Sequence, residues 1–170
     1  MDLEIRGTPD KGVGVFTTRP FSLLEVVLRF EGPRLKRSQL PLFIPDEEDH
    51  YLQVGPDDYL GPSGKVDDFV NHSCLPNCGV VIVEDGMPLL VALRPLRSGE
   101  ELTFDYSTTS TDIDTWSLTC LCGTPVCRQV VSGFTLLPRQ IQARYIEMGI
   151  VPKYVIDHVE PVLGVEPRCL

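Results

Sequence analysis

Short stretches in which apolar and polar residues alternate follow one another over residues 3–106, a pattern typical of strands with one buried face. Turn signals separate them, for example at 84–86 and 97–100. No ten-residue helical period lies between them, which argues against a doubly wound parallel sheet. The pattern therefore predicts a mostly β fold, with strands at 3–5, 13–15, 26–30, 80–82, 89–93 and 102–106.

Towards the C-terminus the apolar period changes from that of strands to that of helices. Pro138 suits the first turn of a helix and Gly149 suits its end. The apolar residues between them at positions i, i+4 and i+7 are Ile141, Tyr145 and Met148. A second short helix is predicted from Pro152 to about Pro161. The stretch 33–50 mixes a basic patch with an acidic one and is predicted to be a surface insertion.

The composition is that of one compact globular domain of 170 residues. Hydrophobic residues make up 42% and charged residues 23%, which excludes a disordered, collagen-like or coiled-coil chain. There is no apolar run long enough to span a membrane, and the acidic start lacks the features of a signal peptide. We therefore expect a soluble, intracellular protein without a membrane partner; the choice between cytoplasm and nucleus stays open.

The chain is acidic, with 15 Lys and Arg against 24 Asp and Glu and a net charge of −9. Such a charge repels phosphate backbones over a Debye length of about 8 Å in physiological salt. Direct nucleic-acid binding is therefore disfavoured. Basic protein segments are the more plausible macromolecular partners, and a solvated acidic surface with no partner is the alternative. The oligomeric state is not indicated.

Cysteine spacing suggests a metal site. The chain has six cysteines, at positions 74, 78, 120, 122, 127 and 169. Without an export signal, clustered cysteines favour metal or redox chemistry over disulfides. Cys120, Cys122 and Cys127 offer three thiolates, and tetrahedral zinc needs a fourth ligand, for which Cys74 and Cys78 are the candidates. Unpaired buried thiols and a redox pair are the alternatives.

Two other segments carry groups suited to a binding site. Gly12-Val13-Gly14 lies beside a predicted strand, where glycines allow close backbone approach to a ligand. Thr17 occupies the third glycine position of the dinucleotide fingerprint and no helix follows, so a Rossmann site is a poor interpretation. The polar stretch 71–77 is kept out of regular helix by Pro76. It is predicted to be a site-forming loop, with an ordinary turn as the alternative.

Four motifs taken together resemble, in the same order, those of SET-domain protein lysine methyltransferases with a post-SET zinc segment. They are 11–16 (KGVGVF), 69–77 (FVNHSCLPN), 99–106 (GEELTFDY) and 120–128 (CLCGTPVCR). The resemblance implies a SET fold of small curved β-sheets with a knot-like crossing of the second and third motifs. It divides the chain into a SET domain (1–110), a post-SET zinc segment (111–133) and a C-terminal helical extension (134–170).

The resemblance also assigns the metal ligands. The cysteine of the Asn-His-Ser-Cys motif, Cys74, would join Cys120, Cys122 and Cys127 around one structural Zn²⁺ ion. Cys78 and Cys169 would then be ordinary thiols. Four thiolates leave no open coordination position for water or substrate, so the metal would have a structural role.

The activity that the resemblance implies is methyl transfer from S-adenosylmethionine to a lysine side chain of a protein substrate, expected to be a basic, histone-like segment. Asn71 and His72 would bind the methionine end of the cofactor. The residues that would add mainly backbone contacts are Lys11, Gly12, Val13 and Gly14. Tyr106 would be the principal catalytic tyrosine and Tyr51 the second tyrosine of the lysine channel. Phe104 would leave room in this channel for di- or trimethylation.

The chain departs from the family pattern at some positions. Asp67-Asp68 stands where the family commonly has Arg, and Gln129 replaces a usual glycine. Trp116 is expected in the core or at a hinge, with closure of the substrate channel as the alternative. Two other functions stay open: a catalytically inactive, zinc-bearing SET module that binds protein, and a thiol redox protein using Cys120 and Cys122.

Overall fold

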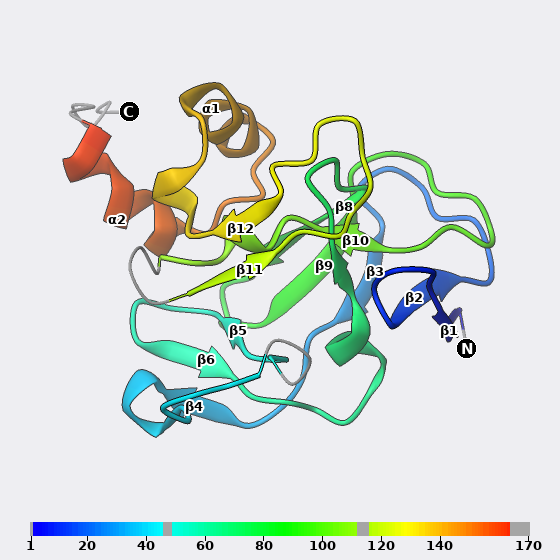
Figure 1. The fold of residues 1–170 in the computed structure, drawn as a ribbon, viewed down its shortest axis with the longest axis horizontal. Helices are drawn as coiled ribbons and strands as arrows, with labels where there is room; N and C mark the ends of the chain where they lie inside the picture. Colours follow the sequence, from blue (N-terminus) through cyan, green and yellow to red (C-terminus); the bar gives the residue numbers. More distant parts are fainter. Residues whose placement is uncertain (1, 46–48, 112–115, 164–170) are drawn as a thin grey trace.

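The structure, a computed structural model, describes residues 2–45, 49–111 and 116–163 and is mostly β (Figure 1). The strands are β1 (Leu3–Gly7), β2 (Val13–Thr17), β3 (Val26–Arg29), β4 (Arg34–Lys36), β5 (Leu52–Gln53), β6 (Asp58–Leu60), β7 (Asn71–His72), β8 (Cys78–Ile82), β9 (Pro88–Ala92), β10 (Thr103–Phe104), β11 (Ser117–Thr119) and β12 (Val130–Ser132). The helices are α1 (Arg139–Glu147) and α2 (Lys153–Leu163), with 3-10 turns η1 (Arg37–Gln39), η3 (Val66–Phe69), η4 (Tyr106–Thr108) and η5 (Phe134–Leu136).

These strands form five small sheets in the part of the chain that the structure describes. Antiparallel pairs join β1 to β2 and β11 to β12, while three-stranded sheets have the orders β3-β9-β8 and β4-β6-β5. The fifth sheet is the parallel pair of β7 with β10, in which Asn71 is the partner of Thr103 and His72 that of Phe104. It brings together the two most specific motifs of the sequence, so the expected crossing of the second and third motifs is present.

The main core lies between the sheets and is built by the inward-facing residues of the alternating strands. Val15, Leu90, Ala92 and Leu102 are completely buried in it. The expectation of a mostly β fold is confirmed, and five of the six predicted strands are present as β1, β2, β3, β8 and β9. The sixth is shorter than predicted: β10 ends at Phe104, because the Asp105 side chain accepts a hydrogen bond from Ser107 N and caps the turn η4.

The described part of 33–50 has no buried residue, as predicted for a surface stretch, but its first part forms a strand. β4 lies there and pairs with β6 in the register Arg34 to Leu60 and Lys36 to Asp58, so this stretch belongs to a sheet. The acidic positions 46–48 lie outside the described residues.

Both C-terminal helices form as predicted. Pro138 precedes α1, and Gly149 follows it with a φ of 69°, a left-handed conformation that glycine adopts without strain. α2 ends at Leu163, slightly later than predicted. A second hydrophobic cluster holds the two helices together, and they lie at one end of the molecule beyond β11 and β12 (Figure 1). None of the described helices is long and apolar enough to cross a bilayer.

Candidate active site

Backbone and side-chain hydrogen bonds fasten the second and third motifs together. Ser73 N donates to Phe104 O at 3.0 Å, continuing the β7–β10 pair. The buried Asn77 amide adds two further bonds: its Oδ1 accepts from Thr103 N at 2.9 Å, and its Nδ2 donates to Glu101 O at 2.8 Å. Asn77 therefore satisfies backbone groups that the short strands leave unpaired, which fixes the relative position of the two motifs.

A cavity of about 650 Å³ lies over this junction. Its wall includes almost all of the cofactor-binding and catalytic residues that the sequence predicts, namely Lys11, Gly12, Val13, Tyr51, Asn71, His72, Phe104 and Tyr106. Gly14 does not reach the wall. The structure thus brings residues separated by up to ninety-five positions around one space, and its wall includes both a glycine and aromatic rings.

Gly14 matters because two side chains fill the space where a Cβ atom would stand. An added Cβ would lie 2.7 Å from Glu101 Oε1 and 2.8 Å from Asn71 Nδ2. Asn71 Nδ2 donates to Val13 O at 2.8 Å and to Glu101 Oε1 at 2.9 Å. Both Glu101 carboxylate oxygens in turn lie 2.7 Å from Lys11 Nζ. Glu101 thus ties the Lys11 side chain to Asn71, two residues of the cavity wall, and the sequence analysis missed this link.

The acidic pair at 67–68 has a local structural role. Asp68 accepts hydrogen bonds from Ser63 N at 3.0 Å and Gly64 N at 2.7 Å, and Asp67 accepts one from Glu31 N at 2.8 Å. These carboxylates tie the chain before η3 to neighbouring backbone amides. The charge change from the family pattern is thus explained by loop structure at this position.

The aromatic side of the cavity is built around Tyr106. Its hydroxyl donates to Val70 O at 2.7 Å, and its ring centroid lies 4.8 Å from that of Phe104 and 5.4 Å from that of His72. Burial raises the pKa of Tyr106, so it stays a neutral phenol at physiological pH. Tyr51 lines the same cavity.

His72 links this aromatic group to the cysteines. Its Nδ1 accepts a hydrogen bond from Tyr106 N at 3.2 Å, and its Nε2 lies 3.3 Å from Cys74 Sγ. Burial, the largest cause, lowers the pKa of His72 to about 4, so the ring is neutral at pH 7. With Nδ1 as an acceptor, the ring proton is on Nε2 and faces the cysteine sulfur.

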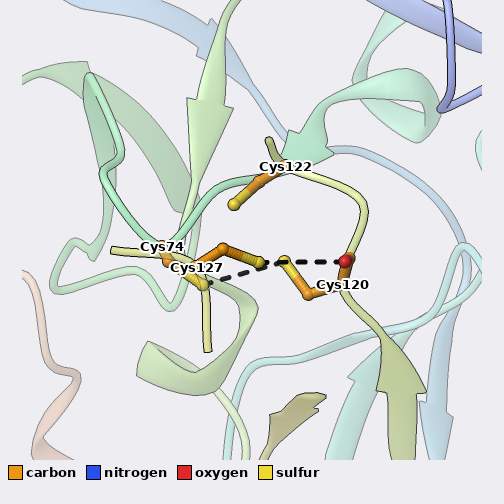
Figure 2. Close-up of side chains that lie close together, drawn as sticks. All are labelled: Cys74, Cys120, Cys122 and Cys127. Atoms are coloured by element: carbon orange, nitrogen blue, oxygen red, sulfur yellow. Dashed lines mark hydrogen bonds between the residues drawn. The ribbon is translucent and has the colours of Figure 1, made fainter. Parts of the chain in front are cut away.

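The four cysteines that the resemblance assigns to zinc meet beside the cavity, and Figure 2 shows their side chains pointing toward one another. All four sulfur atoms lie within 4.8 Å of one another, and Cys74 Sγ is 3.7 Å from Cys120 Sγ. A tetrahedral site with Zn–S bonds of about 2.3 Å has sulfur atoms about 3.8 Å apart, so the cluster fits zinc. Arg128 N and Gln129 N donate to Cys74 Sγ and Cys127 Sγ, as suits thiolate ligands.

The other two cysteines differ. Cys78 is completely buried in the main core, away from this group, and burial raises the pKa of its thiol to about 12. It packs as an ordinary thiol. Cys169 lies outside the described residues.

A buried ion pair behind Tyr106 was not foreseen from the sequence. The Asp105 side chain is 0% exposed, and Arg128 Nη1 and Nη2 approach its two oxygens at 2.8 Å each. Tyr145 of α1 donates to Asp105 Oδ2 at 3.0 Å. One carboxylate thus joins the third motif, the cysteine segment and the C-terminal helices. No sequence signal pointed to this pairing, because the three residues come from separate segments.

Trp116 forms part of the cavity wall and packs against the cysteine cluster. Its indole Nε1 donates to Asp49 Oδ2 at 2.7 Å. Trp116 is thus in contact with a core cluster and with the cavity at the same time. The bond to Asp49 joins two wall residues that are sixty-seven positions apart in the sequence.

The structure thus combines a mostly β fold, a parallel pairing of two motifs, an Asn-His pair beside a partly buried tyrosine, and four clustered cysteines. A sequence model of the SET domain matches residues 12–107, and the chain belongs to the SET-domain family.

Two relatives illustrate the sequence similarity. A histone-lysine N-methyltransferase described as H3 lysine-4 specific, from Eremothecium gossypii, is 31% identical over 134 residues, covering 68% of this chain and 13% of the relative. A probable histone-lysine N-methyltransferase, set-23, from Caenorhabditis briggsae is 30% identical over 143 residues, covering 75% of this chain and 59% of the relative. The chain thus spans between about an eighth and three fifths of the length of these relatives.

Solved structures show the same fold. KRYPTONITE in complex with mCHH DNA, an H3 peptide and SAH superposes with a TM-score of 0.63 at 21% identity, covering 76% of this chain and 29% of that one. SUVH6 from Arabidopsis thaliana in complex with SAM gives a TM-score of 0.64 at 20% identity, covering 76% of this chain and 33% of that one.

Proposed function

We propose that this chain is an S-adenosylmethionine-dependent protein-lysine methyltransferase. The observation that carries the proposal is the cavity over the β7–β10 pair, which joins a polar end at Asn71 and Val13 to an aromatic end at Phe104 and Tyr106. The printed names of the relatives, which are histone-lysine methyltransferases, support this activity. The SAH and SAM named with the solved structures support the choice of cofactor.

The polar end of the cavity suits the methionine part of the cofactor. Among the described residues, no donor occupies Asn71 Oδ1, because the hydrogen bonds of this side chain are made by Nδ2. Oδ1 can therefore accept from an ammonium group, while Gly12 allows close backbone approach at its φ of 69°. When bound, S-adenosylmethionine supplies an activated sulfonium methyl group.

The aromatic end suits the lysine side chain, which must lose its proton before it attacks. With a pKa of about 10.4, a neutral lysine at pH 7 costs about 4.6 kcal/mol. Tyr51, Phe104 and Tyr106 provide an environment that disfavours ammonium by excluding water. The Tyr106 hydroxyl donates its hydrogen bond to Val70 O. The lone pairs of its oxygen can therefore orient the amine. Tyr106 thereby acts through position, because its raised pKa prevents it from serving as a base.

Acidic side chains around the cavity favour a basic substrate segment. Five carboxylates belong to its wall, Asp10, Glu31, Asp49, Asp67 and Asp68, against one lysine, Lys11. Their field attracts a cationic peptide before the lysine enters the aromatic end. A lysine in a basic, histone-like segment is therefore the substrate we propose, and such a substrate would place the protein in the nucleus.

The cysteine cluster would hold one Zn²⁺ ion through Cys74, Cys120, Cys122 and Cys127. Four thiolates fill a tetrahedral site, so the metal would supply a cross-link between the second motif and the cysteine segment. One equivalent of tightly held zinc would also exclude a redox role for Cys120 and Cys122, because metal-bound thiolates are occupied.

Incubation with methyl-labelled cofactor and a panel of basic proteins, including histones, tests the proposal. We expect labelled lysine, and a fall of at least about tenfold for Tyr106→Phe, the order expected when a positioned polar group is lost. Calorimetric titration of both forms with cofactor provides the control, since the variant should bind it as the parent does. Binding without labelling of any protein would instead favour an inactive SET module, and equal labelling by both forms would remove Tyr106 from its role.

A further inference from the structure

We propose that the C-terminal extension, of which the structure describes residues 134–163, is part of the catalytic unit. Tyr145 on α1 and Tyr154 on α2 are positioning residues: they hold the two backbone segments that carry Tyr106 and Tyr51. This inference rests on the proposed methyltransferase function, since it concerns the geometry of the same aromatic site.

Tyr145 acts on the segment of Tyr106 through Asp105. The Tyr145 hydroxyl donates to Asp105 Oδ2 at 3.0 Å, and Asp105 Oδ1 accepts from Ser107 N at 3.2 Å. Asp105 thereby caps the turn η4, whose first residue is Tyr106. Tyr145 on α1 thus binds the Asp105 side chain, and Asp105 caps the turn that follows β10.

Tyr154 connects the segments of both channel tyrosines directly. Its hydroxyl lies 2.8 Å from Gln53 O and 2.6 Å from Thr109 O, so its single proton is shared between two carbonyl groups. Gln53 lies two residues after Tyr51, and Thr109 lies three residues after Tyr106. The hydroxyl therefore fixes the separation of the two segments.

Side-chain hydrogen bonds of Gln53 join the same two segments. Gln53 is buried, its Nε2 donates to Thr111 Oγ1 at 2.8 Å, and its Oε1 accepts from Thr111 N at 2.9 Å. Residues 105–111 include no strand, and β10 before them has two residues. Because no sheet holds this stretch, hydrogen bonds position it, among them those to Gln53, Tyr145 and Tyr154.

The helices of the extension have a hydrophobic core of their own. They pack around Phe134, Val155 and Val159, which are at most 1% exposed. Leu93, which follows β9, packs against the same cluster, so the helices are anchored on the central sheet as well as at the site. The tyrosine hydroxyls therefore have fixed positions from which to hold the site segments.

The test compares Tyr145→Phe and Tyr154→Phe with Val159→Ala, which destabilises the same helices without removing a bond to the site. We expect each Phe variant to lower kcat by about fivefold, the rate equivalent of one lost hydrogen bond, with the KM for methyl donor changed less than twofold. Val159→Ala should lower the melting temperature at least as much and retain parental kcat. Equal kcat losses in all three, or unchanged kcat in both Phe variants, would overturn the inference.

Hydrogen exchange gives a readout that does not require activity. In Tyr154→Phe, amides of the stretches 52–55 and 108–111 should exchange several times faster than in the parent, while Val159→Ala should leave them at parental rates. If the parent chain methylates nothing, the proposed function fails, but these rates still decide whether the tyrosines hold the segments. Parental exchange rates in Tyr154→Phe would contradict the positioning role.

Discussion

Asp105→Asn should destabilise the protein more than any exposed charge change, because it breaks a buried ion pair and leaves Arg128 without its counter-charge. The Asp105 side chain is 0% exposed and that of Arg128 14%, and two contacts of 2.8 Å join them. Removing one partner of a buried pair costs about 3–5 kcal/mol. For a chain of this size each kcal/mol lowers the melting temperature by about 2–4 °C, so we expect a fall of about 6–20 °C.

The assay is thermal and urea unfolding followed by circular dichroism, with Asp157→Asn as matched control. Asp157 pairs with Lys153 on the surface of α2, where both side chains are more than half exposed, so its loss should cost less than about 0.5 kcal/mol. Arg128→Met and the double variant complete a cycle. If Asp105→Asn shifts the midpoint no more than Asp157→Asn, or if the cycle gives no coupling energy, the buried pair does not have the importance assigned to it.

Three further variants test other parts of the site. Cys74→Ser should lower bound zinc well below one equivalent by elemental analysis, whereas Cys78→Ser, in the core, should retain it; equal metal contents would contradict the ligand set. Gln129→Gly should raise the melting temperature slightly and Gln129→Ala should not, because the φ of 66° strains any residue with a Cβ atom. Gly14→Ala should weaken cofactor binding at least about tenfold in calorimetry with little change in melting temperature, since its Cβ displaces only side-chain ends; parental affinity would refute this.

The strands that could be predicted are those with enough residues to show a period. β1, β2, β8 and β9 have five residues each, long enough for a run of strand-forming apolar residues to be recognised in the sequence. β5, β7 and β10 have two residues each, and β4, β6, β11 and β12 have three. A period of two cannot be recognised over such lengths, and these strands are defined by partners distant in sequence. That is why β4 was expected to be part of a surface insertion.

The candidate site likewise has a part that the sequence predicts and a part that it does not. The motif pattern identified Asn71, His72 and Tyr106 as neighbours, and the structure places them around one cavity. The motif pattern did not predict the hydrogen bonds between the motifs. The bond of Glu101 to Lys11, for example, joins residues ninety positions apart. Such a pairing depends on how distant segments pack against each other, and this packing cannot be derived from the pattern of a single sequence. Gln129 was different, since the family's usual glycine marked the position where the structure has a positive φ.

His72 explains why the cysteine cluster and the aromatic site belong together. One ring nitrogen accepts from Tyr106 N and the other faces Cys74 Sγ, so a neutral ring in one tautomer is needed for both contacts. A thiolate favours the Nε2 proton on its side, which leaves Nδ1 free to accept from the tyrosine backbone. A structural metal on Cys74 would therefore do more than join two segments. By keeping that sulfur a thiolate, it would select the tautomer that holds Tyr106 in place.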